Sequence, residues 1–276
     1  MSRHAAIALL LLAAASGPAL ADQCKHSAPR SLDLDFSGVK SVMFDVGHHE
    51  LRVNAASGAT GAVKGRACAS DADRLDRLTL TQERSGDKLV VRLASDSSWS
   101  GFSLGARYAY LALEASVPDS VLVQVDVGSG DAWITGASSL SADVGSGDVD
   151  ARRTKGLVTA KVGSGDIKVD DAGALHVLSI GSGDVEAANL RGDAEVGSIG
   201  SGDFNLERAT GNVKIGSIGS GDAELSDIGG SVSVRSIGSG GLEAHRVGGD
   251  LTVSSLGSGD VDHSGVKGRV DLPRKR

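Results

Sequence analysis

The sequence predicts an all-β protein: a parallel β-solenoid with coils of about 18–19 residues and an irregular β cap at its N-terminal side. The motif G-S-G-D, or a close copy, recurs along the chain, and the starting numbers of successive copies differ by 17, 18 and 18 and then by a steady 19. A fixed period of roughly 20 residues is typical of stacked solenoid coils. Outside the segment 1–21, no part of the chain sustains the i, i+3, i+4, i+7 spacing of an amphipathic helix. The motif starts at Gly128, Gly145, Gly163, Gly181, Gly200, Gly219, Gly238 and Gly257.

The segment 1–21 is expected to be a secretory signal peptide. Arg3 precedes an apolar stretch at 5–15, and Ala19-Leu20-Ala21 forms an A-x-A cleavage site. The apolar stretch is too short to span a bilayer, and no later segment is apolar enough to do so. We therefore expect an exported protein, in the periplasm or at the cell surface, with no transmembrane segment in the mature chain.

The region 22–127 has strand character without the strict period and is expected to form the cap. Alternating apolar residues predict strands at 31–36, 41–46, 50–54, 78–82, 88–93, 108–115 and 121–127, and 72–78 suits a helical turn. These strands form either irregular first coils or a β cap over the open solenoid end. The two cysteines, Cys24 and Cys68, are expected to form a disulfide in an oxidising compartment.

The region 128–276 is expected to be the regular solenoid, with two short strands in each coil. When the coils are aligned on the motif, apolar residues recur two apart, which is strand alternation. Glycines at the motif and at the twelfth position mark turns with positive φ or close approaches between coils. Eight coils rising about 4.8 Å each would form a rod on the order of 35–40 Å long. The twelfth-position glycines are Gly192, Gly211, Gly230, Gly249 and Gly268.

Composition and missing motifs argue against nucleic acid as a partner and against catalysis. Removing 1–21 takes away one of the 28 basic residues and none of the 35 acidic ones, so the mature net charge is about −8. Binding to a phosphate backbone needs a basic face, which this chain lacks. The sequence contains no G-x-S-x-G, H-E-x-x-H, phosphate loop or dinucleotide fingerprint. We expect no catalytic residue and no cofactor.

An aspartate column follows the motif glycines and offers one candidate metal site. Stacked coils would place neighbouring carboxylates about 5 Å apart, where a cation such as calcium would relieve their repulsion. The alternative is that each carboxylate accepts hydrogen bonds from the amides of its own turn. The motif occurs once per coil and its period drifts, unlike the calcium-binding nonapeptide repeats, which favours the turn interpretation. The column comprises Asp131, Asp148, Asp166, Asp184, Asp203, Asp222 and Asp260.

Aromatic residues and a histidine pair are the other candidates. Trp99, Phe102, Tyr108 and Tyr110 lie within one short stretch, in a chain whose aromatic content is only 3%. They would either stack on a sugar or partner protein, or plug the first coil. His48 and His49 would point to opposite faces of a strand, so a solvated turn is favoured there over a metal site.

The G-S-G-D coils, with the Val-Pro-Asp-Ser stretch at 117–120 before them, resemble a bacterial family of β-strand-repeat domains. Its members are described as "putative adhesins", and the related head GIN domain is described as a "putative autotransporter adhesin". The resemblance implies a parallel β-solenoid and an exported location, and it brings no catalytic residues. Unlike an autotransporter, this chain is not expected to carry a membrane-spanning β-barrel after its repeats.

Together these observations predict an exported, non-enzymatic module of the bacterial envelope with a structural or adhesive role. Its partner would be an envelope or cell-surface component, either protein or glycan. A calcium-binding repeat module is one alternative, and metal-dependent folding would identify it. A polysaccharide-acting β-helix enzyme is another, and it would need acids, bases and aromatics clustered in one groove.

Overall fold

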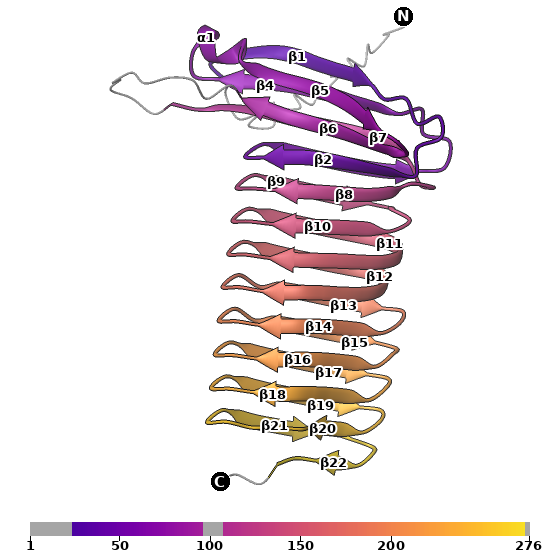
Figure 1. Ribbon diagram of the computed structural model, residues 1–276, viewed down its shortest axis with the longest axis vertical. Coiled ribbons are helices and arrows are strands. Elements are labelled where there is room, and N and C mark those ends of the chain that lie inside the picture. The colour runs from indigo at the N-terminus through magenta and orange to yellow at the C-terminus, as the bar shows by residue number, and fades with distance from the viewer. Residues whose placement is uncertain (1–23, 96–106, 274–276) are drawn as a thin grey trace, which may run out of the picture.

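A computed structural model describes residues 24–95 and 107–273, and it confirms the all-β parallel solenoid (Figure 1). The predicted signal peptide, Trp99 and Phe102 lie outside these residues. The coils stack along one axis, with the N-terminal strands at one end and the C-terminal coil at the other. No helix in the described ranges is long and apolar enough to cross a membrane.

Each coil contributes one strand to each of two opposite faces, here called the β8 face and the β9 face after one strand of each. Two long strands, β11 (Asp148–Val162) and β12 (Asp166–Ile180), bend around an edge and belong to both faces. The β8 face also contains β6 (Lys88–Ser95), β2 (Ser41–Gly47), β8 (Leu122–Val127), β10 (Leu140–Val144), β14 (Ala194–Ile199), β16 (Val213–Ile218), β18 (Val232–Ile237), β20 (Leu251–Val253) and β22 (Val270–Asp271). The β9 face also contains β7 (Ala109–Pro118), β3 (Glu50–Ala56), β9 (Asp131–Thr135), β13 (Val185–Leu190), β15 (Phe204–Ala209), β17 (Asp222–Ile228), β19 (Gly241–Val247) and β21 (Asp260–Ser264).

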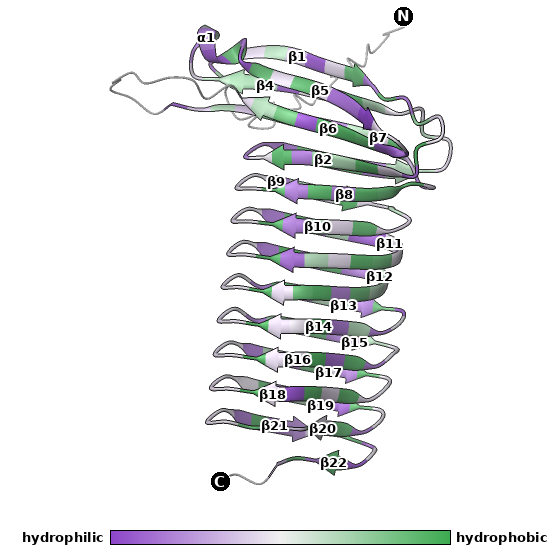
Figure 2. Ribbon diagram, viewed as in Figure 1, coloured by the Kyte–Doolittle hydropathy of each residue, from purple (hydrophilic) through white to green (hydrophobic). Residues whose placement is uncertain are grey.

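The core is a thin layer of aliphatic side chains between the two faces. Apolar and polar residues alternate along the strands (Figure 2), and the apolar ones point inward. Parallel pairing in register places like positions on top of one another, as in the column Val185, Phe204, Ala223 and Leu242. Each of these side chains is fully buried. The aliphatic columns therefore stabilise the rod mainly through burial of apolar area.

The order of the coils in space differs from their order in the chain. Strand β2 pairs in parallel with both β6 and β8, and β3 pairs in parallel with both β7 and β9. The β2–β3 coil is therefore sandwiched between the β6–β7 coil and the β8–β9 coil. Both interpretations of the N-terminal region apply in part, because these strands form first coils while others form a cap.

The cap consists of β1 (His26–Asp33), β4 (Ala62–Ala69), β5 (Leu78–Ser85) and the short helix α1 (Ala72–Leu75). Strand β4 pairs antiparallel with β1 and β7, and β5 pairs antiparallel with β6. Arg30 donates to the carbonyls of Leu78 and Leu75, joining β1 to the segment that enters β5. The predicted disulfide is present between Cys24 and Cys68, and it fixes the N-terminal segment to β4.

The G-S-G-D motif joins the two faces at one edge, and its third-position glycines are fixed by stacking. A Cβ at Gly202 would overlap the carbonyl oxygen of Gly183 in the preceding coil, and the same clash recurs in the other coils. None of these glycines has positive φ. Close approach, rather than left-handed backbone, is thus the reason for glycine at this column.

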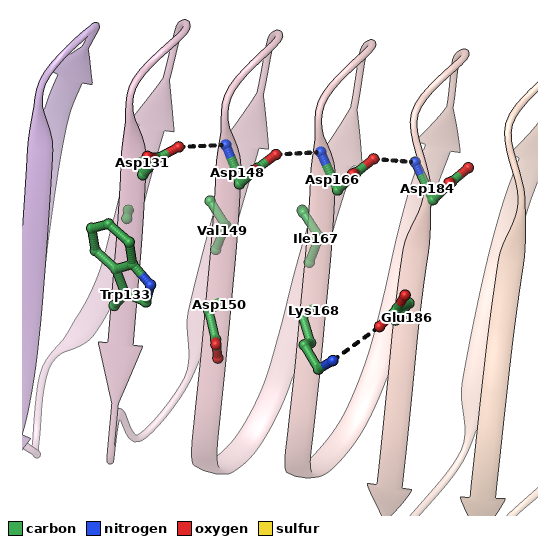
Figure 3. Close-up of a pocket in the computed structure, with 11 residues that line it drawn as sticks. Asp131, Trp133, Asp148, Val149, Asp150, Asp166, Ile167, Lys168, Asp184 and Glu186 are labelled. Atoms are coloured by element: carbon green, nitrogen blue, oxygen red, sulfur yellow. Dashed lines mark hydrogen bonds and ion pairs between the residues drawn. The ribbon is translucent and has the colours of Figure 1, made fainter.

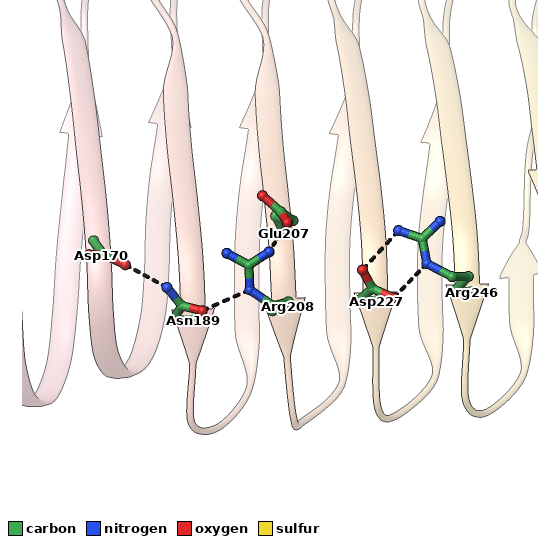
Figure 4. Close-up of polar contacts among 6 residues, drawn as sticks. All are labelled: Asp170, Asn189, Glu207, Arg208, Asp227 and Arg246. Atoms are coloured by element: carbon green, nitrogen blue, oxygen red, sulfur yellow. Dashed lines mark hydrogen bonds and ion pairs between the residues drawn. The ribbon is translucent and has the colours of Figure 1, made fainter.

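The opposite edge combines close approach with left-handed backbone, but at different positions. The twelfth-position glycines again lie against the coil before them, as Gly211 does against Gly192. Positive φ occurs three positions earlier in the coil, at glycine in the first and last coils (Gly136 and Gly265) and at other residues in the coils between them. Residues of this column make hydrogen bonds along the axis (Figure 4): Arg208 donates to Asn189, and Asn189 donates to Asp170, which precedes Asp171 of the column. The members of this positive-φ column other than glycine are Arg153, Asp171, Asn189, Arg208, Asp227 and Arg246.

Two insertions at fixed places explain why the period of the motif lengthens along the chain. The pairing of β11 with β12 shifts register between Thr154 and Leu157, at the opposite edge, and again after Ala160, on the β8 face. The second shift is a β-bulge in which Leu178 and Ser179 both face outward. The two 18-residue coils each carry one of the two insertions, and the 19-residue coils carry both.

Candidate functional site

A large recess lies where the cap meets the first coils, and it is called here the junction cleft. Its volume is about 870 Å³. One wall comes from α1 and the residues around it, and the other comes from the turns that follow β2 and β8. The segment from Arg107 to Tyr110, which leads into β7, closes one side. The cleft thus lies beside the β6–β7 coil, with Ser95 at the end of β6 also in its lining.

Side chains of both charges line the junction cleft. The cationic and imidazole groups are Arg74, Arg77, Arg107 and His48. The carboxylates are Glu50, Asp71, Asp73 and Asp131. Arg74 is held by Asp71 at 2.9 Å. The lining therefore offers both donors and acceptors to a ligand.

Two of the four predicted aromatic residues, Tyr108 and Tyr110, line the junction cleft. Their ring centroids are 6.2 Å apart and the rings are tilted by 46°. The hydroxyl of Tyr108 accepts a hydrogen bond of 3.0 Å from the backbone amide of Lys25. The hydroxyl of Tyr110 lies 4.0 Å from the Cys24 sulfur. The disulfide-anchored segment thus holds both rings in place.

The histidine pair lies in a turn, as expected from the sequence, but only His48 is solvated, and the prediction was wrong for His49. His48 is exposed, and its Nε2 lies 3.3 Å from the hydroxyl of Ser95. His49 is fully buried, and its Nδ1 accepts a 3.2 Å hydrogen bond from the amide of Leu111. Burial, and to a lesser extent the neighbouring His48, lower the pKa of His49 to about 4.

The register explains this burial. Glu50 pairs with Asp131, so the sequence Gly47-His48-His49-Glu50 occupies the place of a G-S-G-D motif one coil earlier. His49 stands at the third-glycine position. Among the described residues no third glycine stacks above it, and the side chain fits there.

The aspartate column bonds between coils rather than within its own turns, which corrects the expected hydrogen-bond pattern. Oδ1 of Asp131 accepts from the amide of Asp148, and Oδ1 of Asp148 accepts from the amide of Asp166 (Figure 3). The series continues through Asp184, Asp203 and Asp222 to the amide of Gly241. Within the described ranges, no group of three or more His, Cys, Asp and Glu side chains is arranged to hold a metal ion.

A second recess, the β9-face groove, shares Asp131 with the junction cleft (Figure 3). Its volume is about 320 Å³. Trp133 is half-buried there, and the Arg52 guanidinium carbon lies 4.2 Å from the ring centroid, a cation–π contact. Lys168 donates to Glu186 across neighbouring coils. The groove lies on the outward side of strands whose inward residues form the core.

The sequence pattern described as "Toastrack DUF4097" matches residues 39–272. The chain belongs to the Toastrack family. The matched range begins just before β2 and includes every coil of the solenoid. The predicted relation to the head GIN domain stays a prediction.

A comparison of the Toastrack chain with solved structures finds likenesses at low sequence identity. A "putative lipid binding protein" from Parabacteroides distasonis is 17% identical with a TM-score of 0.50, covering 87% of this chain and 97% of its own. A "putative adhesin" from Bacteroides fragilis is 16% identical with a TM-score of 0.47, covering 90% of this chain and 98% of its own. The first of these likenesses supports the fold alone. No curated protein matches the chain.

Two site residues of this Toastrack chain escaped the sequence reasoning. Trp133 stands at an outward position whose neighbours along the axis are Arg52 and Asp150, so nothing in the local sequence marks it as a surface aromatic. Arg77 belongs to no sequence motif that would mark it as a site residue. For Trp133, the available signal was its strand parity, because Ala132 and Ile134 on either side are the inward residues.

Proposed function

We propose that this chain is an exported, non-enzymatic, adhesin-like binding module of the bacterial cell envelope. The observation that carries this proposal is the junction cleft, where the repetition of the rod is interrupted and aromatic, cationic and acidic side chains gather. A stiff solenoid would hold this cleft at a fixed orientation and distance from any attachment point. Several copies on one surface would sum weak contacts by multivalency.

The arrangement of polar groups in the cleft favours binding over catalysis. Ser95 and His48 form the one serine–histidine contact of the described cleft, at 3.3 Å. A catalytic pair of this kind needs a third group that orients the base. Among the described residues, no carboxylate is hydrogen-bonded to His48. Of the repeated G-S-G-D serines, Ser129 lines the same cleft, and the others follow further along that edge of the rod.

Purified protein consisting of residues 22–276 tests the proposal. We expect saturable binding to bacterial cells, to isolated envelope fractions or to immobilised glycans, without release of sugar. Absence of binding to all three would overturn the adhesive role. Release of reducing or unsaturated sugar from an envelope polysaccharide would instead identify an enzyme.

A further inference from the structure

We propose that the junction cleft binds a short segment of a glycan, an inference that rests on the proposed binding role. The cleft volume of about 870 Å³ lies within the range of about 300–1,000 Å³ typical of small-molecule sites. Its described lining lies at an edge of the rod, next to the cap.

The aromatic wall is preorganised for stacking. Tyr108 is fixed through its hydroxyl by the Lys25 amide at 3.0 Å. Its ring stands 6.2 Å from that of Tyr110, which lies beside the disulfide. Rings that are already fixed lose little conformational entropy when a ligand binds. A sugar ring presents an apolar C–H face, and an aromatic ring offers a matching apolar surface.

The polar walls suit a ligand whose groups both donate and accept hydrogen bonds. Arg77 and His48 offer donors, and Glu50 and Asp73 offer acceptors. Each hydroxyl of a sugar can donate one hydrogen bond and accept others, so it finds partners on both walls. A strongly anionic ligand would meet the carboxylates of the same cleft, which disfavours a phosphate-rich occupant.

The scarcity of aliphatic side chains argues for a glycan rather than a peptide. Ala109 is the only aliphatic residue among those that line the cleft in the described structure. Peptide recognition relies on buried apolar anchors that fill hydrophobic pockets. A hollow near Gly241 on the β9 face differs from the junction cleft in two respects: the charged residues that line it are all acidic, and none of its lining residues is aromatic.

Matched substitutions inside and outside the cleft test the inference. Glu50→Gln and Arg77→Gln remove a charge from the cleft. Glu195→Gln and Arg235→Gln make the same changes on exposed positions of the β8 face, outside both recesses. Binding of the intact protein and the four variants to an array of immobilised neutral and acidic oligosaccharides is measured first. Kd is then measured for the strongest oligosaccharide, and thermal melts confirm that each variant is folded.

We expect the intact protein to bind at least one oligosaccharide and each cleft variant to weaken binding about tenfold or more, the effect of one lost charged hydrogen bond. The two control variants should bind as the intact protein does. Equal binding by all five proteins would overturn the cleft assignment while leaving a glycan-binding role. Binding to an envelope protein but to no oligosaccharide would overturn the glycan inference alone. Binding to no cell, envelope fraction or oligosaccharide would overturn both proposals.

Discussion

At the scale of single residues, the third glycine of the G-S-G-D motif governs how closely the coils stack. The backbone of each turn lies directly on the turn before it, with no room for a Cβ between them. The adjacent serine, by contrast, is exposed in coil after coil. Two neighbouring positions of one motif thus differ completely in what they tolerate.

Gly202→Ala should therefore destabilise the protein severely, by at least about 3 kcal/mol, because the new methyl group would overlap the carbonyl of Gly183. The matched control is Ser201→Ala in the same turn, where we expect a change within about 0.5 kcal/mol. Urea denaturation followed by circular dichroism measures both. A Gly202→Ala protein as stable as the control would contradict the close stacking.

His49 makes stability depend on pH, because folding requires its neutral form. Its folded pKa of about 4 lies below the ordinary value of 6.5, so its contribution is complete above pH 6.5 and is lost as the pH falls toward 4. The difference corresponds to about 3 kcal/mol. Nε2 is buried without a hydrogen-bond partner in the described structure, so the protonated ring would have no acceptor there.

The test compares the intact protein with His49→Gln in urea titrations between pH 7 and pH 4. The variant lacks the titrating ring, so the stability advantage of the intact protein should shrink by about 3 kcal/mol over that interval. His48→Gln is the matched control, because His48 is exposed, and it should keep most of the pH dependence. A constant difference between the intact protein and His49→Gln would rule out the buried neutral histidine.

At the scale of elements, strand positions could be predicted better than strand partners. Alternation is a local property, so the two strands of each coil follow from columns such as Val213 with Ile215. The sandwiching of β2 and β3 depends on pairing between distant segments, which no local pattern encodes. Strand β4 was missed because Gly65 interrupts its alternation, and Gly65 lies against the backbone of β7.

The same limit applies to the site. Tyr108 and Tyr110 were predictable from their clustering in an aromatic-poor chain. The burial of His49 was not predicted because the sequence Gly47-His48-His49-Glu50 does not match G-S-G-D, although it occupies the position of that motif in the stack of coils. Trp133 and Arg77 depend on which surfaces the cap and the coils bring together. The chemistry of the cleft is therefore a property of the assembled junction.

The disulfide should contribute a measurable part of the cap's stability. It joins residues 44 apart in the sequence, and the chain-entropy estimate for such a loop is up to about 4 kcal/mol. The double substitution Cys24→Ala with Cys68→Ala should lower the free energy of unfolding accordingly. Urea denaturation of the variant and of the reduced intact protein should agree. No loss in either would mean that the cap is held by its strands alone.

At the scale of the whole molecule, two rows of side chains reinforce the rod along its edges. One is the aspartate column at the G-S-G-D edge. The other runs along the opposite edge, where a side-chain oxygen accepts from the backbone amide one coil further on. This second row comprises Asp193, Asn212, Ser231 and Asp250, with the amide of Arg269 as its last donor.

The two rows lead to a prediction about calcium. In the second row, asparagine and serine take the place of aspartate. The stacking therefore requires a side-chain oxygen that accepts a hydrogen bond from a backbone amide, and it does not require a negative charge. In the aspartate column the same demand already engages Oδ1 of six carboxylates in succession. Calcium takes about six to eight oxygen ligands, which a single row of half-engaged carboxylates does not supply.

We therefore expect the thermal melt of residues 22–276 to shift by no more than about 1 °C between excess chelator and millimolar calcium. Magnesium at the same concentration controls for general screening of the acidic surface. Asp184→Asn keeps an accepting oxygen and should fold with similar stability, whereas Asp184→Ala should lose about 1 kcal/mol, the value of one hydrogen bond. A rise of several degrees with calcium alone, abolished in Asp184→Asn, would show instead that the column binds the cation in the folded state.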